Sequence, residues 1–143
     1  MTAAATTVLL AGRFEPDERE AWWQALQSAA PEFVWRRDDA PFEREAIDAA
    51  VVANPAPGAL QGLPRLRLIQ SLWAGVDKLL QDASVPSAVP LARMVDPAMS
   101  AAMAETALWA VLGLHRRYFD YAAQQRQTLW QPLPQRRADE PGV

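Results

Sequence analysis

The chain has 143 residues, contains no cysteine and carries a net charge of −3. Half of the residues are hydrophobic, enough for one domain with a buried core, and the pI near 5.1 argues against a nucleic-acid-binding protein, whose surface must be basic. The lack of cysteine excludes disulfides and thiolate metal sites and favours a reducing compartment. The start lacks the regions of a signal peptide, and the longest strictly apolar run, about 107–114, is shorter than the ~20 residues of a membrane span. We therefore expect a cytoplasmic protein with no nucleic-acid and no membrane partner.

Short apolar runs alternate with helical patterns in the first two thirds of the chain. Because these runs are mostly apolar, they suit strands that are buried on both faces of a parallel sheet. The alternation predicts an α/β fold, a flavodoxin-like doubly wound parallel sheet of about five strands. We expect the second and fifth strands at the edges, the fifth because Pro90 cannot donate to a ladder. The predicted strands are 7–11, 33–35, 49–53, 67–71 and 89–92, and the predicted helices are 17–30 and 75–81, with a weaker helical turn or two at 42–48.

The last third of the sequence predicts one long helix. Asp96 can cap a helix that starts at Pro97, and no other proline interrupts the pattern before Pro132. A helix over 97–126 would be roughly 45 Å long. Its first half is apolar nearly all round, which predicts burial on more than one side. The segment 130–134 reads as an extended arm, and 135–140 as a linker.

The stretch 71–77 is the strongest candidate for a binding site. An apolar strand runs into Ser71, then into a corner at Ala74 and Gly75, and then into a helix start. In α/β sheets ligands bind beyond the carboxyl ends of the strands, where free backbone N–H groups can hold an anion and glycine allows close approach. The alternative is that Gly75 is an ordinary turn residue.

Other chemically notable residues favour structural roles. His115 is the only histidine and follows an apolar helical run, so we interpret it as a cation at a helix end, and no second ligand is spaced to form a metal site. Glu105 in an apolar helix predicts a carboxylate that pairs with an arginine or caps a loop. Met94, Met99 and Met103 favour packing, although Met99 stays a pocket candidate.

Several segments together resemble the D-2-hydroxyacid dehydrogenase family. They are 63–71, 74–77, 89–91 and 103–105, the last opening an Ala/Leu-rich helix that ends in Arg116 and Arg117. The arm 126–134, with Trp-Gln-Pro-Leu-Pro at 130–134, is similar to the glyoxylate/hydroxypyruvate reductase A branch. The resemblance covers nearly the whole chain and implies a two-domain enzyme. It implies a flavodoxin-like substrate-binding domain over 1–95, and over 96–143 the interdomain helix, the arm and the start of an NAD(P)-binding Rossmann domain.

The resemblance also implies roles for single residues. In the family, the loop that matches Ala74, Gly75 and Val76 holds the substrate carboxylate by its N–H groups, Asn54 would line the same cleft, and Trp73 and Met99 would shape the pocket. The implied full-length reaction reduces a small 2-oxo acid, such as glyoxylate or hydroxypyruvate, to the 2-hydroxy acid with NADPH or NADH. A homodimer would form through 97–134, and Trp130 would either anchor the arm or reach the partner subunit.

The chain also departs from the family pattern. The phosphate fingerprint G-x-G-x-x-G is absent, since no three of the six glycines have that spacing, and the family's catalytic Arg, Glu and His would lie downstream. We therefore expect an amino-terminal portion of such an enzyme, inactive alone, with no catalytic, cofactor-binding or metal-binding residues of its own.

Three other classes were weighed against this interpretation. A phosphoacceptor receiver domain needs an acidic cluster after the first strand and an aspartate after the third, where this chain has Gly12-Arg13 and Asn54-Pro55. A flavin-binding flavodoxin needs a phosphate loop rich in Ser, Thr and Gly after the first strand, which the segment from Arg13 does not provide. The remaining alternative is a non-catalytic flavodoxin-like binding or interaction module.

Overall fold

The structure is a computed structural model that describes residues 5–135 and 137. It consists of two compact units, Met1–Val95 and Asp96–Val143, here called unit 1 and unit 2. Each unit is described separately below.

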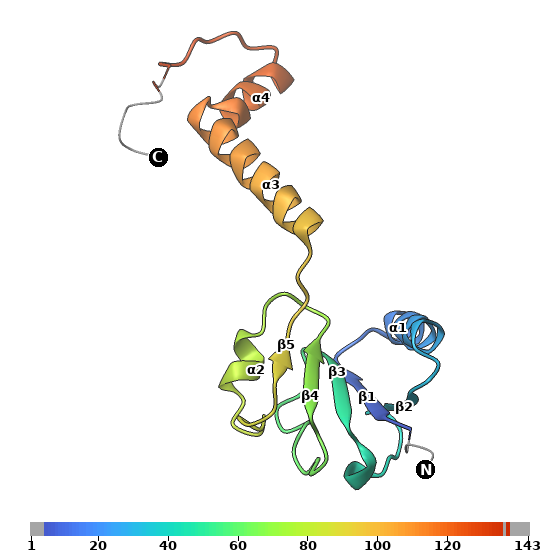
Figure 1. Cartoon of the computed structure of the whole chain (residues 1–143). Helices are drawn as coiled ribbons and strands as arrows, with labels where there is room; N and C mark the ends of the chain where they lie inside the picture. The colour runs from blue at the N-terminus through green and yellow to red at the C-terminus, as the bar shows by residue number, and fades with distance from the viewer. Residues whose placement is uncertain (1–4, 136, 138–143) are drawn as a thin grey trace. The chain divides into compact units, whose positions relative to one another are not determined.

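Unit 1 is an α/β layer built on a five-stranded sheet in the order β2-β1-β3-β4-β5, with all neighbours parallel (Figure 1). This confirms the predicted parallel sheet of five strands, with β2 and β5 at its edges. Its elements are β1 (Thr7–Gly12), α1 (Pro16–Ala29), β2 (Val34–Arg37), the 3-10 turn η1 (Arg44–Ala46), β3 (Ala49–Ala53), β4 (Leu68–Ser71), α2 (Asp77–Gln81) and β5 (Leu91–Ala92).

The core of unit 1 lies mainly on one face of the sheet. Leu9, Val52 and Ile69 from β1, β3 and β4 pack there with apolar residues of the segment 60–66 and with Leu79 of α2. The sequence produces this because the three central strands are apolar and can be buried on both faces. α1 contains no buried residue, and its large apolar side chains Trp22, Trp23 and Leu26 are only half-buried.

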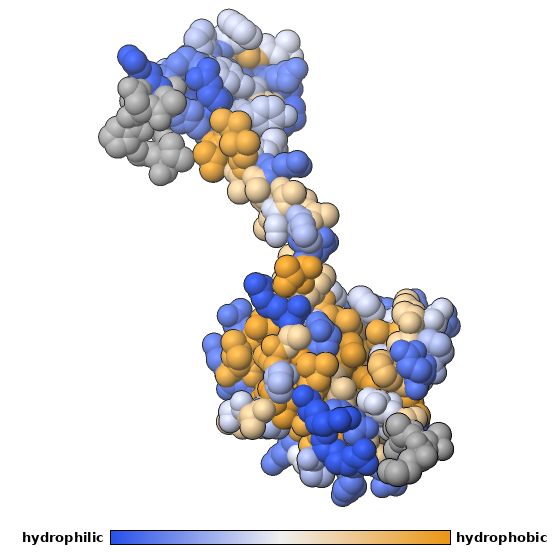
Figure 2. Space-filling model, in the orientation of Figure 1, coloured by the Kyte–Doolittle hydropathy of each residue, from blue (hydrophilic) through white to orange (hydrophobic). Residues whose placement is uncertain are grey.

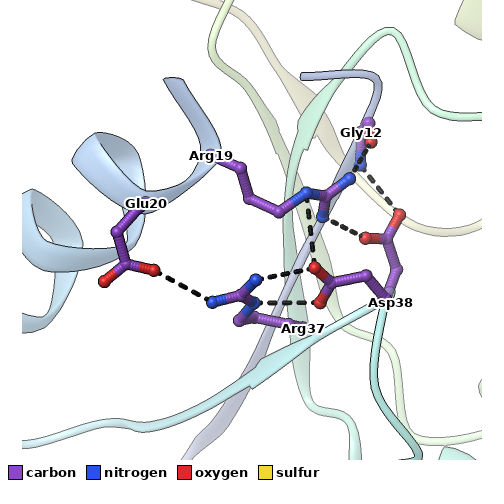
Figure 3. A network of polar contacts seen from close by, with 6 residues as sticks. Gly12, Arg19, Glu20, Arg37 and Asp38 are labelled. Carbon is purple, nitrogen blue, oxygen red and sulfur yellow. Dashed lines mark hydrogen bonds and ion pairs between the residues drawn. The ribbon is translucent and has the colours of Figure 1, made fainter. Parts of the chain in front are cut away.

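A polar network joins α1 to the carboxyl ends of β1 and β2 (Figure 3). Arg19 of α1 donates to the Gly12 carbonyl oxygen at 2.7 Å and to Asp38 at 2.6 Å, while Asp38 accepts the Gly12 N–H at 2.9 Å. Arg37 pairs with Asp39 at 2.6 Å and with Glu20 of α1 at 3.2 Å. The hydrogen bond from Arg37 is the main cause that lowers the pKa of Asp39. The network therefore fixes the end of β1, from which Arg13 leaves the sheet.

Unit 2 contains two helices where the sequence predicts one. α3 (Pro97–His115) and α4 (Tyr118–Arg126) are separated at Arg117, whose φ of 56° is left-handed. The prediction of a continuous helix over 97–126 was therefore wrong. Phe119 packs back on α3: its ring meets Trp109 edge to face at 5.8 Å between centroids and lies against Gly113, where a Cβ would come within 3.3 Å. This packing turns the chain, and helical periodicity does not reveal it.

The start of α3 is as predicted, but its environment is not. Asp96 caps the helix by accepting the Ala98 N–H at 2.9 Å. Gly113 is the one buried residue of α3, and its large apolar side chains are exposed, Leu108 by 60% and Leu112 by 51% (Figure 2). Apart from Phe119 of α4, the described part of unit 2 leaves this helix uncovered, so the predicted burial on more than one side is not observed within the unit.

By length and composition alone, α3 could also span a membrane, since it has 19 residues and an 18-residue window of it has a mean hydropathy of 1.2. Core helices of soluble proteins meet the same criterion, and the expectation of no membrane partner stays a prediction.

Candidate functional site

The carboxyl ends of β3 and β4 bring most of the predicted site residues to one edge of the sheet. β3 and β4 are parallel neighbours, and the Leu72 N–H donates to the Val52 carbonyl oxygen at 2.9 Å just beyond the last ladder pair. Asn54 comes directly after β3, and Trp73 comes two residues after the end of β4. Asn54 has a left-handed φ of 45°, which asparagine tolerates better than most residues.

Ser71 shapes the start of the loop after β4. It is buried, its Oγ donates to the Trp73 carbonyl oxygen at 3.0 Å, and the same Oγ accepts the Trp73 N–H at 3.1 Å. The Trp73 carbonyl also accepts the Met94 N–H at 3.3 Å, and Arg93 donates to the Ala74 carbonyl at 3.1 Å. The carbonyl groups of the loop are thus turned toward internal donors.

The N–H groups of the loop have no such partners. Among the described residues, none accepts a hydrogen bond from the backbone N–H of Ala74, Gly75 or Val76. α2 begins only at Asp77 and is five residues long, so Gly75 lies before the helix and not in its first turn as predicted. The three N–H groups therefore belong to an exposed loop and are free to bind an acceptor from outside.

Space is available in front of Gly75. A Cβ built there meets nothing closer than the Asp77 carboxylate at 4.0 Å, and the φ of Gly75 is not positive. Neither the backbone conformation nor a close neighbour therefore requires glycine at position 75, whereas a Cβ on Gly12 would clash with its neighbours. Val76 packs partly against the core cluster and anchors the other end of the loop.

Met99 is the one predicted site residue outside unit 1. It lies in the first turn of α3 in unit 2 and is 38% exposed. The structure therefore groups Asn54, Trp73, Ala74, Gly75 and Val76 in one unit and leaves Met99 in the other.

A small pocket beside this edge contains residues that the sequence analysis missed. Its volume is about 120 Å³, and Arg13, Asn54 and Lys78 supply its polar lining together with Asp82, while Pro55, Pro57 and Leu79 supply apolar walls. Arg13 and Lys78 are far apart in the sequence, and only the sheet order brings them together.

Unit 2 has a larger groove between α4 and the arm, with a volume of about 880 Å³. The Tyr121 hydroxyl accepts the Leu133 N–H at 3.0 Å and holds the arm against α4. Trp130 lines the groove and is 90% exposed, so it does not anchor the arm by burial. The predicted linker over 135–140 lies largely outside the described residues.

The remaining candidates do not form a catalytic group. His115 is in the last turn of α3, as predicted, and Glu105 is exposed instead of buried. Within the described ranges, no cluster of His, Asp or Glu could hold a metal ion. The glycines also lack the spacing of a dinucleotide-binding turn, so the residues of this chain do not fit a nicotinamide cofactor.

In sequence and in fold the chain is similar to one part of the D-2-hydroxyacid dehydrogenases. Over 133 residues it is 35% identical to glyoxylate/hydroxypyruvate reductase A of Citrobacter koseri, a match that covers 89% of this chain and 42% of the relative. The reductase of the same name from Yersinia enterocolitica is 35% identical over 131 residues, or 86% of this chain and 41% of the relative. The chain thus spans less than half the length of these relatives. No family model matches the chain.

Solved structures show the same relationship. The D-isomer specific 2-hydroxyacid dehydrogenase of Xanthobacter autotrophicus, in complex with NADPH and MES, has a TM-score of 0.73 and 30% identity over 93% of this chain and 43% of that one. The NADPH-dependent glyoxylate/hydroxypyruvate reductase of Sinorhizobium meliloti, in complex with NADP and sulfate, has a TM-score of 0.72 and 33% identity over 93% and 42% of the two chains.

Proposed function

We propose that unit 1 is the substrate-binding part of an NAD(P)H-dependent 2-hydroxyacid dehydrogenase that reduces a small 2-oxo acid such as glyoxylate or hydroxypyruvate. The observation that carries the proposal is the row of three unpartnered N–H groups at Ala74, Gly75 and Val76 beyond the carboxyl end of β4. A carboxylate accepts hydrogen bonds from several such donors at once. Asn54 and Trp73 would border the bound acid on the sides of β3 and β4.

Unit 1 would bind and orient the acid, and a nucleotide-binding part would supply the hydride. Similar proteins with NADPH or NADP bound support the participation of a nicotinamide cofactor in the full-length reaction. Residues 96–143 would form the connection to that part and, through α3 and the arm, a homodimer contact. The lack of cysteine supports work in the cytoplasm, where thiols stay reduced and structural disulfides are rare.

An equilibrium titration with oxalate tests the site. Oxalate carries the carboxylate of a 2-oxo acid and does not react. We expect weak binding to the chain, measured by calorimetry at low salt. Gly75→Val should abolish it, because the added side chain fills the space in front of the N–H groups, which nothing in the fold occupies within 4.0 Å.

Leu80→Val is the matched control, since the Leu80 side chain is 70% exposed on α2 and the substitution keeps the backbone hydrogen bond from Leu80 to the Val76 carbonyl oxygen. Equal oxalate affinity of the Gly75→Val variant and the wild-type chain would disprove the carboxylate site. The alternative function, a non-catalytic binding module, would be favoured by that result, because it requires no acid at this loop.

A further inference from the structure

Arg13 and Lys78 differ from the other basic residues of unit 1. Nearly every basic side chain of the unit forms an ion pair or donates to a carbonyl oxygen, namely Arg19, Arg36, Arg37, Arg44, Arg65, Arg67 and Arg93. Among the residues that the structure describes, the side chains of Arg13 and Lys78 form no hydrogen bond and no ion pair. Both line the same pocket, whose lining also contains the Asp82 carboxylate, so two basic groups and one acidic group meet at one small cavity.

The pocket lies where the fold favours ligand binding. From β1 the chain crosses to β2 on one side and then to β3 on the other, so the strand order changes direction between β1 and β3 (Figure 1). Crevices beyond the carboxyl ends of the strands at such a switch point bind ligands in open α/β sheets. Arg13 follows β1 and Asn54 follows β3, which places the pocket at this point.

The backbone around the pocket is held in place before any ligand binds. The Arg13 N–H donates to the Ala53 carbonyl oxygen at 3.0 Å, and the preceding Gly12 is bonded on both sides by Arg19 and Asp38 (Figure 3). On the opposite wall, Lys78 is carried by α2, whose Leu79 is only 6% exposed and fixes the helix to the core. The side chains of Arg13, Asn54 and Lys78 are exposed, so their backbone positions are fixed in advance and their side chains order on binding.

The acidic residue of the pocket does not neutralise these charges by contact. Asp82 accepts from Ser84 Oγ at 2.7 Å, from the Ser84 N–H at 2.9 Å and from the Gly58 N–H at 3.1 Å. The hydrogen bonds from Ser84, followed by that from Gly58, lower the pKa of Asp82, so it is ionised and turned toward internal donors at neutral pH. It shapes the loop over the pocket and leaves Arg13 and Lys78 available.

We propose that this pocket binds a phosphate-sized oxyanion, held by Arg13 and Lys78 with Asn54 as a neutral hydrogen-bond partner. The volume of about 120 Å³ suits a group of a few heavy atoms and is well below the roughly 300–1,000 Å³ of sites that enclose whole cofactors or drug-sized ligands. Ala74, Gly75 and Val76 do not line the pocket, so it is a second anion site, which shares Asn54 with the proposed carboxylate site.

The test is a titration of the ¹⁵N-labelled chain with inorganic phosphate at low salt. We expect saturable amide shifts at Arg13, Asn54 and Lys78. Arg13→Gln and Lys78→Gln should each weaken phosphate binding about tenfold, as the loss of one charge-assisted hydrogen bond predicts. Arg126→Gln removes the same charge from the exposed end of α4 in unit 2 and should leave the affinity unchanged.

Further arms separate this site from the carboxylate loop and identify the source of the anion. Gly75→Val should leave phosphate binding intact, and Arg13→Gln should leave oxalate binding intact, so each site can fail alone. Tighter binding of glycerol 3-phosphate than of inorganic phosphate would assign the site to an organic phosphate, and the reverse order to the free anion. Absence of shifts at Arg13, Asn54 and Lys78, or wild-type affinity in both charge variants, would overturn the proposal.

Discussion

Asp48 is a buried carboxylate that connects the segments at the amino-terminal ends of β1, β3 and β4. Only 4% of it is exposed, and its carboxylate accepts the Thr7 N–H at 3.0 Å and pairs with Arg65 at 2.8 Å and Arg67 at 3.6 Å. It thus ties the start of β1 to the segment that leads into β4. The Thr7 hydrogen bond is the largest cause that lowers the pKa of Asp48, followed among the stabilising contacts by Arg65.

This lowered pKa predicts an acid-sensitive contribution to stability. Because the folded pKa of Asp48 lies below the unfolded value of about 3.9, the ionised carboxylate stabilises the fold above that pH, and the contribution is lost as the pH falls through the folded pKa. Asp48→Asn should cost about 1–3 kcal/mol at pH 7 and flatten the loss of stability below pH 4. Urea unfolding measured from pH 7 to pH 3 checks this, with the exposed Asp17→Asn as the control. A variant as stable and as acid-sensitive as wild type would contradict it.

Gly12 and Gly75 make a second contrast at the scale of single residues. A Cβ on Gly12 would lie 2.5 Å from the Ala53 carbonyl oxygen and 2.7 Å from the Phe14 ring, whereas a Cβ on Gly75 has open space. Gly12→Ala should therefore destabilise the chain by about 1–3 kcal/mol, and Gly75→Ala should change the unfolding free energy little. Thermal unfolding of the two variants tests the pair, and equal destabilisation would show that the β1–β3 approach is looser than described.

At the scale of elements, the strands of unit 1 were predictable and the helices of unit 2 were not. Runs such as Ala49–Ala53 are apolar without interruption, so they define buried strands without knowledge of their neighbours. The helix break at Arg117 depends on Phe119 reaching back to Gly113 and Trp109, and the periodicity of the sequence contains no sign of it. Tertiary packing decided that element.

Substitution of the left-handed Arg117 by glycine tests this break, because the expected change in stability has opposite signs for two helices and for one continuous helix. In the observed α3–α4 turn, Arg117→Gly relieves a positive φ of 56° and should stabilise unit 2 by about 1 kcal/mol. In a continuous helix the same substitution would cost about 1 kcal/mol. Circular dichroism at 222 nm followed through thermal unfolding distinguishes the two. Lower helicity and a lower Tm for Arg117→Gly would favour the single helix.

The candidate site was predicted in part, for a similar reason. The small residues at 74–75 after an apolar strand indicated the loop, and the resemblance to the dehydrogenases supplied its role. Arg13 and Lys78 gave no signal, because lone basic residues in a sequence do not reveal that they lack carboxylate partners. Their convergence follows from the order of the strands, which brings the ends of β1 and β3 beside α2.

At the scale of the whole molecule, the apolar surface of α3 has the largest consequence. Exposed apolar patches of this kind mark interfaces, and a homodimer contact through 97–134 is the proposal made above. The chain should sediment as a dimer or larger species. Leu108→Glu combined with Leu112→Glu, one turn apart on α3, should shift it to the monomer. Leu80→Glu, on an equally exposed leucine of unit 1, is the control. A wild-type chain that sediments as a monomer at all concentrations would contradict the contact.

The sequence of the whole chain also limits the reaction that we expect from the purified protein. This chain has no dinucleotide fingerprint, and within the described ranges no group of His, Asp or Glu could hold a metal ion. We expect the purified chain neither to bind NADPH nor to oxidise it in the presence of glyoxylate, as followed by absorbance at 340 nm. Turnover above the uncatalysed rate would show that residues 1–143 act as a complete enzyme.

In the proposed site, the N–H groups of Ala74, Gly75 and Val76 in the loop after β4 hold the carboxylate of a 2-hydroxy or 2-oxo acid. Amide shift mapping during a titration of the ¹⁵N-labelled chain with glycolate tests this binding most directly. We expect saturable shifts that are largest at residues 74–77 and are lost in Gly75→Val. Shifts that leave these amides unmoved at saturating glycolate would contradict it.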